Sequence, residues 1–416
     1  MTAVVGILNK QAIAIAADSA VTVTTNTGKK IFNKANKIFT LSKYHPVGII
    51  IYNSASLMGI PWETIIKVYR NNLKKKSFGS LEEYQKDFLK FLKTKNYFLN
   101  NEIQKIHTHH FLVNFSMAII QKPEKKEQPG TSIATRLKSA MSIIERILST
   151  AGQIEGLAGF TYEQFDSYTK DAFDEIRKSV LSDPSITDEI FTQYKKFMFM
   201  LINKQEDGID HTGLIFCGFG DNEIFPSMIP MNISMVIDNK LRCYIIDKKR
   251  ATIGHMVNAA IRPFAQTDVI DTILQGIDPN LEKILVSNFE KTLQKYGEAI
   301  ATALGGNTPM AMMVRNVSIV KLGEEFRNLN SAIKQKHHVT PLINAVANLA
   351  KEDLSEMAES LIYLTYLKRR ITFAEESVGG PVDVAIISKG DGFVWMKRKH
   401  YFDAEINQSF LKKYFE

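Results

Sequence analysis

The sequence predicts an α+β protein in which sheets are layered between helices. Runs with strand-like alternation or continuous apolar character occur in three blocks, at the beginning, in the middle and at the end of the chain. Two long stretches of helical periodicity separate these blocks. The order of strands, helices, strands, helices and strands differs from the regular βαβ alternation of a doubly wound fold.

The first block, up to about residue 52, is rich in predicted strands. Two apolar runs on either side of Asn9-Lys10 predict a hairpin that ends at Asp18. Alternating β-branched segments around an Asn-Thr-Gly turn predict a second hairpin, because Asn and Gly favour tight turns. The segments "NKIFTL" and "VGIIIYNS" predict a further pair of strands, and Lys37 stands at the start of the first of them.

Helical periodicity dominates most of 77–205 and most of 252–372. The last helix, predicted over 351–370, begins with acidic residues and ends with basic residues, which suits the helix dipole. We predict one domain, residues 1–416, with helical insertions at about 77–205 and 263–350.

Strands are predicted again at 212–221, 233–238 and 241–247, and the segment "GGPVDVAIISKGDGFVWM" predicts a strand, a turn and a closing strand. Cys217 and Cys243 are the two cysteines of the chain, and both fall in predicted strands. We expect buried, reduced thiols, as is usual in a reducing compartment.

Composition narrows the classes of function. The net charge is +8, but the lysines are spread along the chain and form no basic stripe interleaved with aromatic residues, so we expect no nucleic-acid partner. No apolar run approaches the roughly 18 residues that span a bilayer, and the first residues do not resemble a signal peptide. We therefore expect a cytoplasmic protein without a membrane partner.

A histidine-rich segment, "HTHH" at 107–110, is the strongest candidate for a metal site. No carboxylate or cysteine stands near it at ligand spacing, so we predict no metal site there. We expect no organic cofactor either.

Thr2 is the candidate catalytic residue. Threonine is a poor nucleophile as an ordinary side chain, but an N-terminal threonine carries its own base, because its free α-amine titrates near neutrality, at about 7.7–8.0. Removal of Met1 ahead of a small residue would create this terminus. Such a nucleophile needs a nearby lysine to favour the ionised hydroxyl and a carboxylate to hold that lysine. Asp18 and Lys37 could supply both groups.

These residues resemble the catalytic β subunits of proteasomes and the bacterial proteasome-like peptidase. Thr2, the strand "AIAIAADS" ending in Asp18 and the strand opening with Lys37 match the family's Thr, Asp and Lys. The "SVGGPVDVAIISKGDGFVWM" ending resembles the family's Gly-Gly segment and last hairpin. The resemblance implies a four-layer αββα N-terminal-nucleophile (Ntn) hydrolase fold with catalytic residues Thr2, Asp18 and Lys37, and it covers roughly 2–75, 212–262 and 350–396.

The resemblance also assigns an oxyanion and substrate groove to the turn Tyr52-Asn53-Ser54, where the family usually has Gly-Gly. His255 in "ATIGHM" stands where the family has a supporting serine, at the expected start of a helix. Glu375 and Ser377 take supporting positions ahead of the Gly-Gly segment.

The resemblance implies a threonine-type protease that cleaves peptide bonds in a peptide or protein substrate. It also implies a homo-oligomer, of which rings are the family's form, and an unfoldase partner. Two alternatives stay open at this point: a catalytically inactive proteasome-like scaffold subunit, and an Ntn amidase that acts on a small molecule. Retention of Met1 would favour the scaffold.

Overall fold

The computed structural model describes residues 2–25, 28–121, 132–206, 208–317, 319–372, 378–400, 402–403, 405–409 and 412. The chain divides into two compact units. The first comprises Met1–Ile38, Ile224–Ser227 and Ala251–Glu416, and the second Phe39–Glu223 and Met228–Arg250. Both units combine helices with antiparallel sheet, so the predicted α+β class is confirmed.

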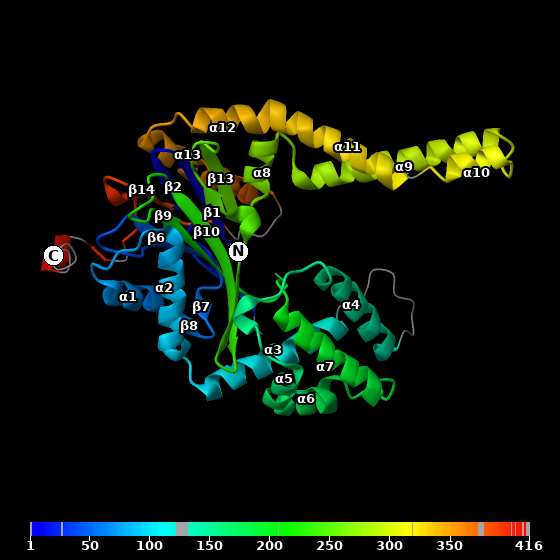
Figure 1. The fold of residues 1–416 in the computed structure, drawn as a ribbon, viewed down its shortest axis with the longest axis horizontal. Helices are drawn as coiled ribbons and strands as arrows, with labels where there is room; N and C mark the ends of the chain where they lie inside the picture. The colour runs from blue at the N-terminus through cyan, green and yellow to red at the C-terminus, as the bar shows by residue number, and fades with distance from the viewer. Residues whose placement is uncertain are drawn as a thin grey trace. The chain divides into compact units, whose positions relative to one another are not determined.

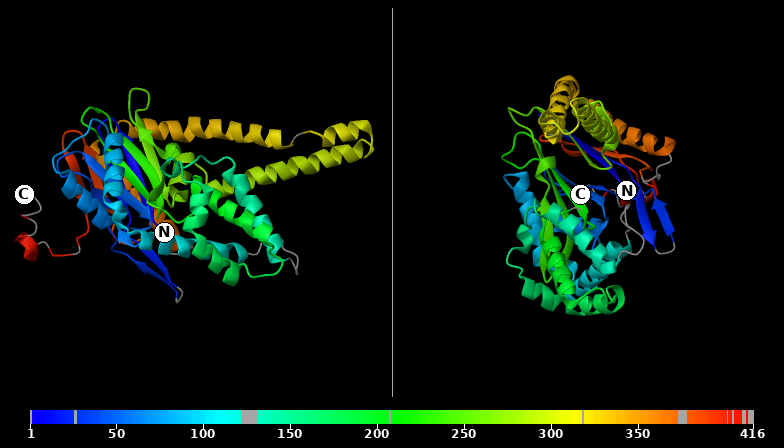
Figure 2. Two further views of the ribbon diagram at one scale, coloured as in Figure 1. Left: turned by 60° about the horizontal axis from the view of Figure 1, so that its bottom comes forward. Right: turned by 90° about the vertical axis from the view of Figure 1, so that its right-hand side faces the viewer.

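The first unit contains a five-stranded sheet in the order β13-β1-β2-β14-β15, and its neighbouring strands run antiparallel. The predicted opening hairpin is its centre, and every residue of β1 and β2 is buried. The strands β3 and β4 pair as a separate hairpin (Figure 2). The strands of this unit are β1 (Ala3–Asn9), β2 (Ala12–Ala17), β3 (Val21–Thr25), β4 (Gly28–Phe32), β12 (Ala251–Thr252), β13 (Ala259–Ala265), β14 (Asp383–Ser388) and β15 (Gly392–Lys397).

The strand β13 corrects the prediction that helices begin soon after residue 252. Its sequence, AAIRPFA, has no clear strand alternation, because Arg262 and Pro263 interrupt the apolar residues. The whole segment nevertheless pairs with β1, with Gly6 opposite Arg262 and Val5 opposite Pro263. Pairing with a distant strand therefore outweighs the local pattern.

Helix α13 packs its apolar stripe on this sheet. Leu354, Ala358 and Ile362 recur at spacings of four residues, and all three are fully buried in one cluster with alternate residues of β1, β2 and β14. Helix α13 spans Lys351–Ile371, close to the predicted helix over 351–370. The helices of this unit are α8 (Asp268–Gln275), α9 (Pro279–Ala303), α10 (Pro309–Arg315), α11 (Ile319–Lys334), α12 (Thr340–Val346) and α13 (Lys351–Ile371).

Helices α9 and α11 lie side by side and form a long arm with α10 at its end (Figure 1). The rings of Phe289 and Phe326 stack between them with centroids 4.2 Å apart, and Arg327 donates to Glu290 at 2.7 Å. The segment predicted as the second helical insertion is therefore helical over most of its length.

The second unit is built on a sheet in the order β11-β10-β9-β6-β5. Helices α1 and α2 bury Trp62, Ile66 and Phe88 in one cluster with this sheet. Cys217 on β9 and Cys243 on β11 are free thiols; Cys217 is buried and Cys243 is partly exposed. The strands are β5 (Ile38–Thr40), β6 (Val47–Asn53), β7 (Ser56–Leu57), β8 (Ile60–Pro61), β9 (Thr212–Gly218), β10 (Ser227–Ile237) and β11 (Lys240–Ile245), and the first helices are α1 (Trp62–Leu73) and α2 (Leu81–Thr94).

The remaining helices of the second unit enclose a second apolar cluster rich in aromatic residues, among them Phe165, Phe173 and Phe197. The block predicted as helical over 77–205 is thus helical in its described part, and its status as an insertion stays a prediction. These helices are α3 (Asn101–Gln121), α4 (Ile133–Leu148), α5 (Tyr162–Tyr168), α6 (Lys170–Glu175) and α7 (Asp188–Asn203).

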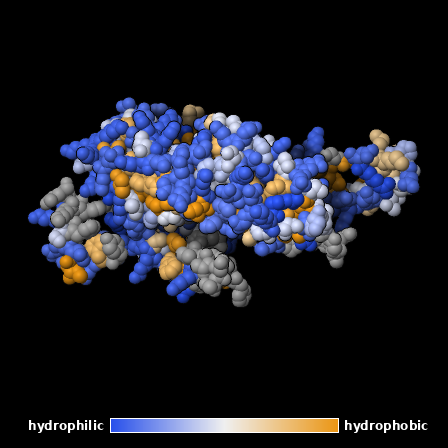
Figure 3. All heavy atoms as spheres, turned by 90° about the horizontal axis from the view of Figure 1, so that it is seen from below, coloured by the Kyte–Doolittle hydropathy of each residue, from blue (hydrophilic) through white to orange (hydrophobic). Residues whose placement is uncertain are grey.

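Most side chains on the face drawn in Figure 3 are hydrophilic, with apolar side chains gathered in smaller patches between them. Among the described helices, none combines the length and the apolar character that crossing a lipid bilayer requires.

Gly380 is the glycine of the first unit whose replacement we expect to cost most. Its φ is +75°, and an added Cβ would lie 2.7 Å from the carbonyl oxygen of Asn33. We expect Gly380→Ala to lower the free energy of unfolding by about 1–3 kcal/mol, because a side chain is strained in this backbone region. Denaturant titration measures the change. The control Gly390→Ala, where no atom lies within 4 Å, should stay within about 0.5 kcal/mol of wild type, and equal losses in both variants would contradict the prediction.

Candidate active site

The β1–β2 hairpin brings Thr2 and Asp18 to the same end of the sheet. The backbone N–H of Asp18 donates to the carbonyl of Ala3 at 3.2 Å, and the N–H of Ala3 donates to Asp18 Oδ1 at 3.0 Å. The carbonyl of Thr2 accepts from the N–H of Gln266 at 3.0 Å, directly after β13. The peptide group between Thr2 and Ala3 is thus held on both edges of β1: its carbonyl by Gln266 and its N–H by the Asp18 carboxylate.

Lys37 approaches the same carboxylate from the residue before β5. Its Nζ lies 2.6 Å from Asp18 Oδ1 and donates to the carbonyl of Ala20 at 2.7 Å. Only 4% of the Lys37 side chain and 1% of the Asp18 side chain are exposed. The structure therefore places the candidate lysine and carboxylate in a buried ion pair next to the residue that follows Thr2.

Two further backbone donors hold the Asp18 carboxylate. Its Oδ2 accepts from the N–H of Ala20 and from the N–H of Gly379, each at 3.1 Å. With Ala3 and Lys37, four donors from the protein converge on one carboxylate. This arrangement fixes the orientation of Asp18 and offsets part of the cost of burying it.

Burial lowers the pKa of the Lys37 ammonium below its ordinary value of 10.5, because desolvation disfavours the charged form. The negative charge of Asp18 and its hydrogen bond act in the opposite direction and offset part of this effect. Lys37 therefore gives up its proton more readily than an exposed lysine, while a carboxylate still favours its charge.

Asp383 and Lys399 form an ion pair near Asp18 that the sequence did not predict. Asp383, which is buried, begins β14 opposite Ala17, the residue before Asp18, and forms an ion pair with the partly buried Lys399. The signal in the sequence was an acidic residue inside the apolar run "VDVAII". Such residues are rarely fully buried unless they are paired.

The residues predicted to form the oxyanion and substrate groove lie in the second unit, at the end of β6. Asn53 has a φ of +65°, and its side-chain amide donates to His211 Nε2 at 3.0 Å. The Tyr52 hydroxyl donates to Asn232 at 3.3 Å, and the Ser54 hydroxyl donates to the carbonyl of Ser56 at 3.0 Å. Their catalytic role stays a prediction.

His255 does not stand at the start of a helix, as the sequence reasoning expected. It lies in the exposed loop between β12 and β13, where its ring meets the ring of Phe225 edge to face at 5.5 Å. The reason is the strand β13, which occupies the segment where a helix was expected. Glu375 and Ser377 lie outside the described residues.

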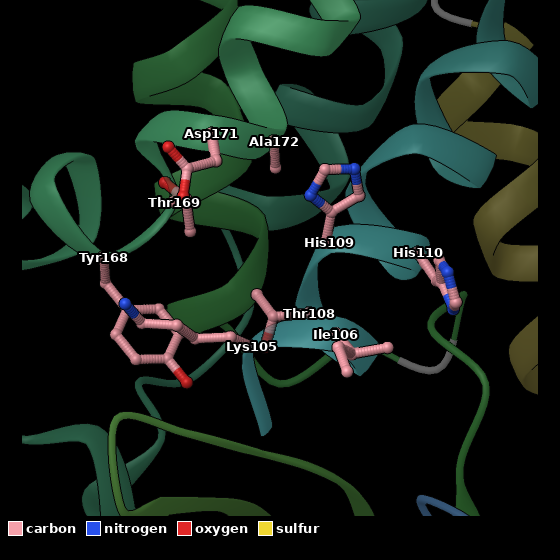
Figure 4. A pocket seen from close by; sticks show the side chains of 9 residues that line it. All are labelled: Lys105, Ile106, Thr108, His109, His110, Tyr168, Thr169, Asp171 and Ala172. Carbon is pink, nitrogen blue, oxygen red and sulfur yellow. The ribbon is translucent and has the colours of Figure 1, made fainter. Parts of the chain in front are cut away.

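The histidines of "HTHH" lie on α3, where the side chains of His109 and His110 point to different sides of the helix (Figure 4). His109 Nε2 lies 2.7 Å from Glu175, and both histidines line a pocket of about 250 Å³ with Tyr168 and Asp171. In the described part of the chain, no group of three or more His, Cys, Asp or Glu side chains is arranged to hold a metal ion.

Comparison with known proteins gives no family match: neither a protein-family model nor a curated protein matches the chain. Three solved structures of Anbu proteins resemble it over nearly its whole length. They are an Anbu (Gly-1) mutant from Hyphomicrobium sp. strain MC1 (TM-score 0.31, 9% identity, 100% of this chain and 96% of that chain), Anbu (ancestral beta-subunit) from Yersinia bercovieri (TM-score 0.27, 8% identity, 99% and 94%) and the helical assembly of the Anbu complex from Pseudomonas aeruginosa (TM-score 0.26, 9% identity, 99% and 92%).

These findings correct the assignment made from the sequence. The sequence predicts membership of the proteasome β subunits and the bacterial proteasome-like peptidase, but no family model or curated protein matches the chain, and these three solved structures are Anbu proteins. All three TM-scores lie below 0.5, so the likeness carries no conclusion about activity.

Proposed function

We propose that the protein is a hydrolase of amide bonds whose nucleophile is the hydroxyl of Thr2. The observation that supports this proposal is the position of the Asp18 carboxylate, which accepts from the N–H of Ala3 and from the ammonium of Lys37. A lysine and a carboxylate thus lie together beside the second residue of the chain. This is the set of groups that an N-terminal threonine nucleophile requires.

The reaction begins when Met1 has been removed and the α-amine of Thr2 is free. The Thr2 hydroxyl oxygen attacks the carbonyl carbon of the substrate, and the α-amine accepts the hydroxyl proton directly or through a water molecule. The C–N bond then breaks, the leaving amine takes the proton, and the acyl group stays on Thr2 as an ester. A water molecule, deprotonated by the same amine, hydrolyses the ester and restores the hydroxyl.

Lys37 acts through its charge. Its ammonium, held by Asp18 and by the carbonyl of Ala20, favours the negative charge that develops on the attacking oxygen. Because the site is buried, this stabilisation is weakened little by solvent. The oxyanion role that the sequence predicts for Asn53 stays a prediction.

Several finer features belong to this proposal as predictions. They are a peptide or protein substrate rather than a small amide, the four-layer αββα sandwich, a single domain with two helical insertions, a cytoplasmic location, a homo-oligomer and an unfoldase partner. The α+β architecture of the two units is compatible with the sandwich, since each unit contains a sheet with helices packed on it.

Intact-mass analysis followed by labelling tests the proposal. The chain, expressed without an N-terminal tag, should lose Met1 and then gain one adduct from an acylating β-lactone, located at Thr2 by peptide sequencing. Thr2→Ala should lose Met1 as well but gain no adduct, whereas Thr2→Ser should keep the reaction. Retention of Met1 would refute the α-amine mechanism and favour a non-catalytic scaffold. Equal labelling of wild type and Thr2→Ala would also contradict the proposal.

A further inference from the structure

A second ion pair, with a buried carboxylate (Asp383) and a partly buried lysine (Lys399), lies beside the Asp18–Lys37 pair and is used by no step of the proposed reaction. Asp383 Oδ1 accepts from the backbone N–H of Lys399 at 2.9 Å, and its other carboxylate oxygen pairs with the Lys399 ammonium. Only 5% of the Asp383 side chain and 11% of the Lys399 side chain are exposed. Burying a carboxylate is costly, and such an ion pair rarely improves stability over an apolar pair, so we ask what else the pair does.

The segment between Gly379 and Asp383 connects the two pairs. At one end, the N–H of Gly379 donates to the Asp18 carboxylate at 3.1 Å, and the carbonyl of Gly379 accepts from the N–H of Ser19 at 3.1 Å. At the other end, Asp383 lies directly opposite Ala17 in the β2–β14 pairing. Both carboxylates are therefore fixed to the same end of β2, within two residues of each other in the sheet.

We propose that Asp383 and Lys399 are positioning residues that set the charge state of Lys37. This inference rests on the proposed function, in which the Lys37 ammonium favours the ionised nucleophile. The positive charge of Lys399 would disfavour the protonated form of Lys37, and the Asp383 carboxylate would reduce this effect by pairing with Lys399.

The charges around Lys37 support this assignment. Besides burial and the dominant influence of Asp18, the Lys399 ammonium lowers the pKa of Lys37 and the Asp383 carboxylate raises it. Asp18, Lys399 and Asp383 are the charged groups that act on Lys37 in the described chain. Interactions between such groups remain effective because the interior screens them less than water does.

Titration of Lys37 in variants of the pair tests the inference. In protein labelled with ¹³C at the lysine ε-carbons, the Lys37 signal is assigned by its loss in Lys37→Arg and followed with pH. Lys399→Met removes the like charge and leaves the Asp383 carboxylate, so the pKa of Lys37 should rise. Asp383→Asn leaves the Lys399 ammonium alone, so the pKa of Lys37 should fall. The pH midpoint of β-lactone labelling at Thr2 should also rise in Lys399→Met and fall in Asp383→Asn.

Lys397→Met is the matched control. Lys397 is two residues from Lys399 and also pairs with a carboxylate, that of Glu359, but 60% of its side chain is exposed. It should leave the titration of Lys37 unchanged. An unchanged pKa of Lys37 in both Lys399→Met and Asp383→Asn, or a shift of both in the same direction, would overturn the inference. Opposite shifts in a protein that keeps Met1 would instead sustain the electrostatic coupling while refuting the proposed hydrolase.

Discussion

Asp18→Ala is expected to lower the free energy of unfolding by about 3–5 kcal/mol, the usual loss when one partner of a buried ion pair is removed. The substitution leaves the Lys37 ammonium buried with the carbonyl of Ala20 as its remaining hydrogen-bond acceptor among those described above. It also removes the acceptor of three backbone N–H groups, those of Ala3, Ala20 and Gly379. Each unsatisfied buried donor adds to the loss. Denaturant titration monitored by circular dichroism measures it.

The control for this loss is a carboxylate–lysine pair of the same protein that is exposed to solvent. Glu63 and Lys67 pair across one turn of α1, and 37% and 48% of their side chains are exposed. Glu63→Ala should change the free energy of unfolding by less than about 1 kcal/mol, because exposed pairs contribute little. A loss for Asp18→Ala as small as the loss for Glu63→Ala would mean that the four donors of Asp18 do not stabilise the fold.

The part of the site that could be predicted from the sequence is the part built by neighbouring elements. Thr2 and Asp18 lie at the two ends of one hairpin, and the lengths of its two apolar runs place them together without knowledge of any other segment. Lys37 follows the next hairpin, so its approach to Asp18 also depends on short-range structure. The closing helix 351–370 was predicted because its apolar spacing and terminal charges are local features.

The part that could not be predicted depends on contacts between segments far apart in the sequence. The strand β13 forms because β1 offers it an edge about 250 residues away, and its own sequence contains an arginine and a proline. The same contact moves His255 into a loop. The pair formed by Asp383 and Lys399 lies beside Asp18 because β14 pairs with β2, and strand order is not encoded in the local pattern of either strand.

Lys37→Met should separate catalysis from stability at this site. If Lys37 favours the ionised nucleophile, its loss should slow β-lactone labelling of Thr2 on the order of 10²–10³-fold, the usual loss when one group that stabilises developing negative charge is removed. The Asp18 carboxylate would still accept from the N–H groups of Ala3, Ala20 and Gly379. Methionine also fills much of the same space with apolar atoms. We therefore expect a smaller loss of unfolding free energy for Lys37→Met than for Asp18→Ala.

The comparison with Lys37→Arg decides whether the site needs only a positive charge at residue 37 or a compact ammonium at the position of the Lys37 Nζ. Arginine keeps the charge but is never deprotonated in proteins, and its planar guanidinium does not fit the position of a compact ammonium. If only positive charge mattered, Lys37→Arg would label Thr2 nearly as fast as wild type. We expect it to label more slowly than wild type, because the guanidinium cannot take the position of the Lys37 ammonium between the Asp18 carboxylate and the carbonyl of Ala20. Rapid labelling of Thr2 in both variants, at unchanged stability, would exclude Lys37 from the mechanism and leave the Asp18–Lys37 pair a purely structural feature.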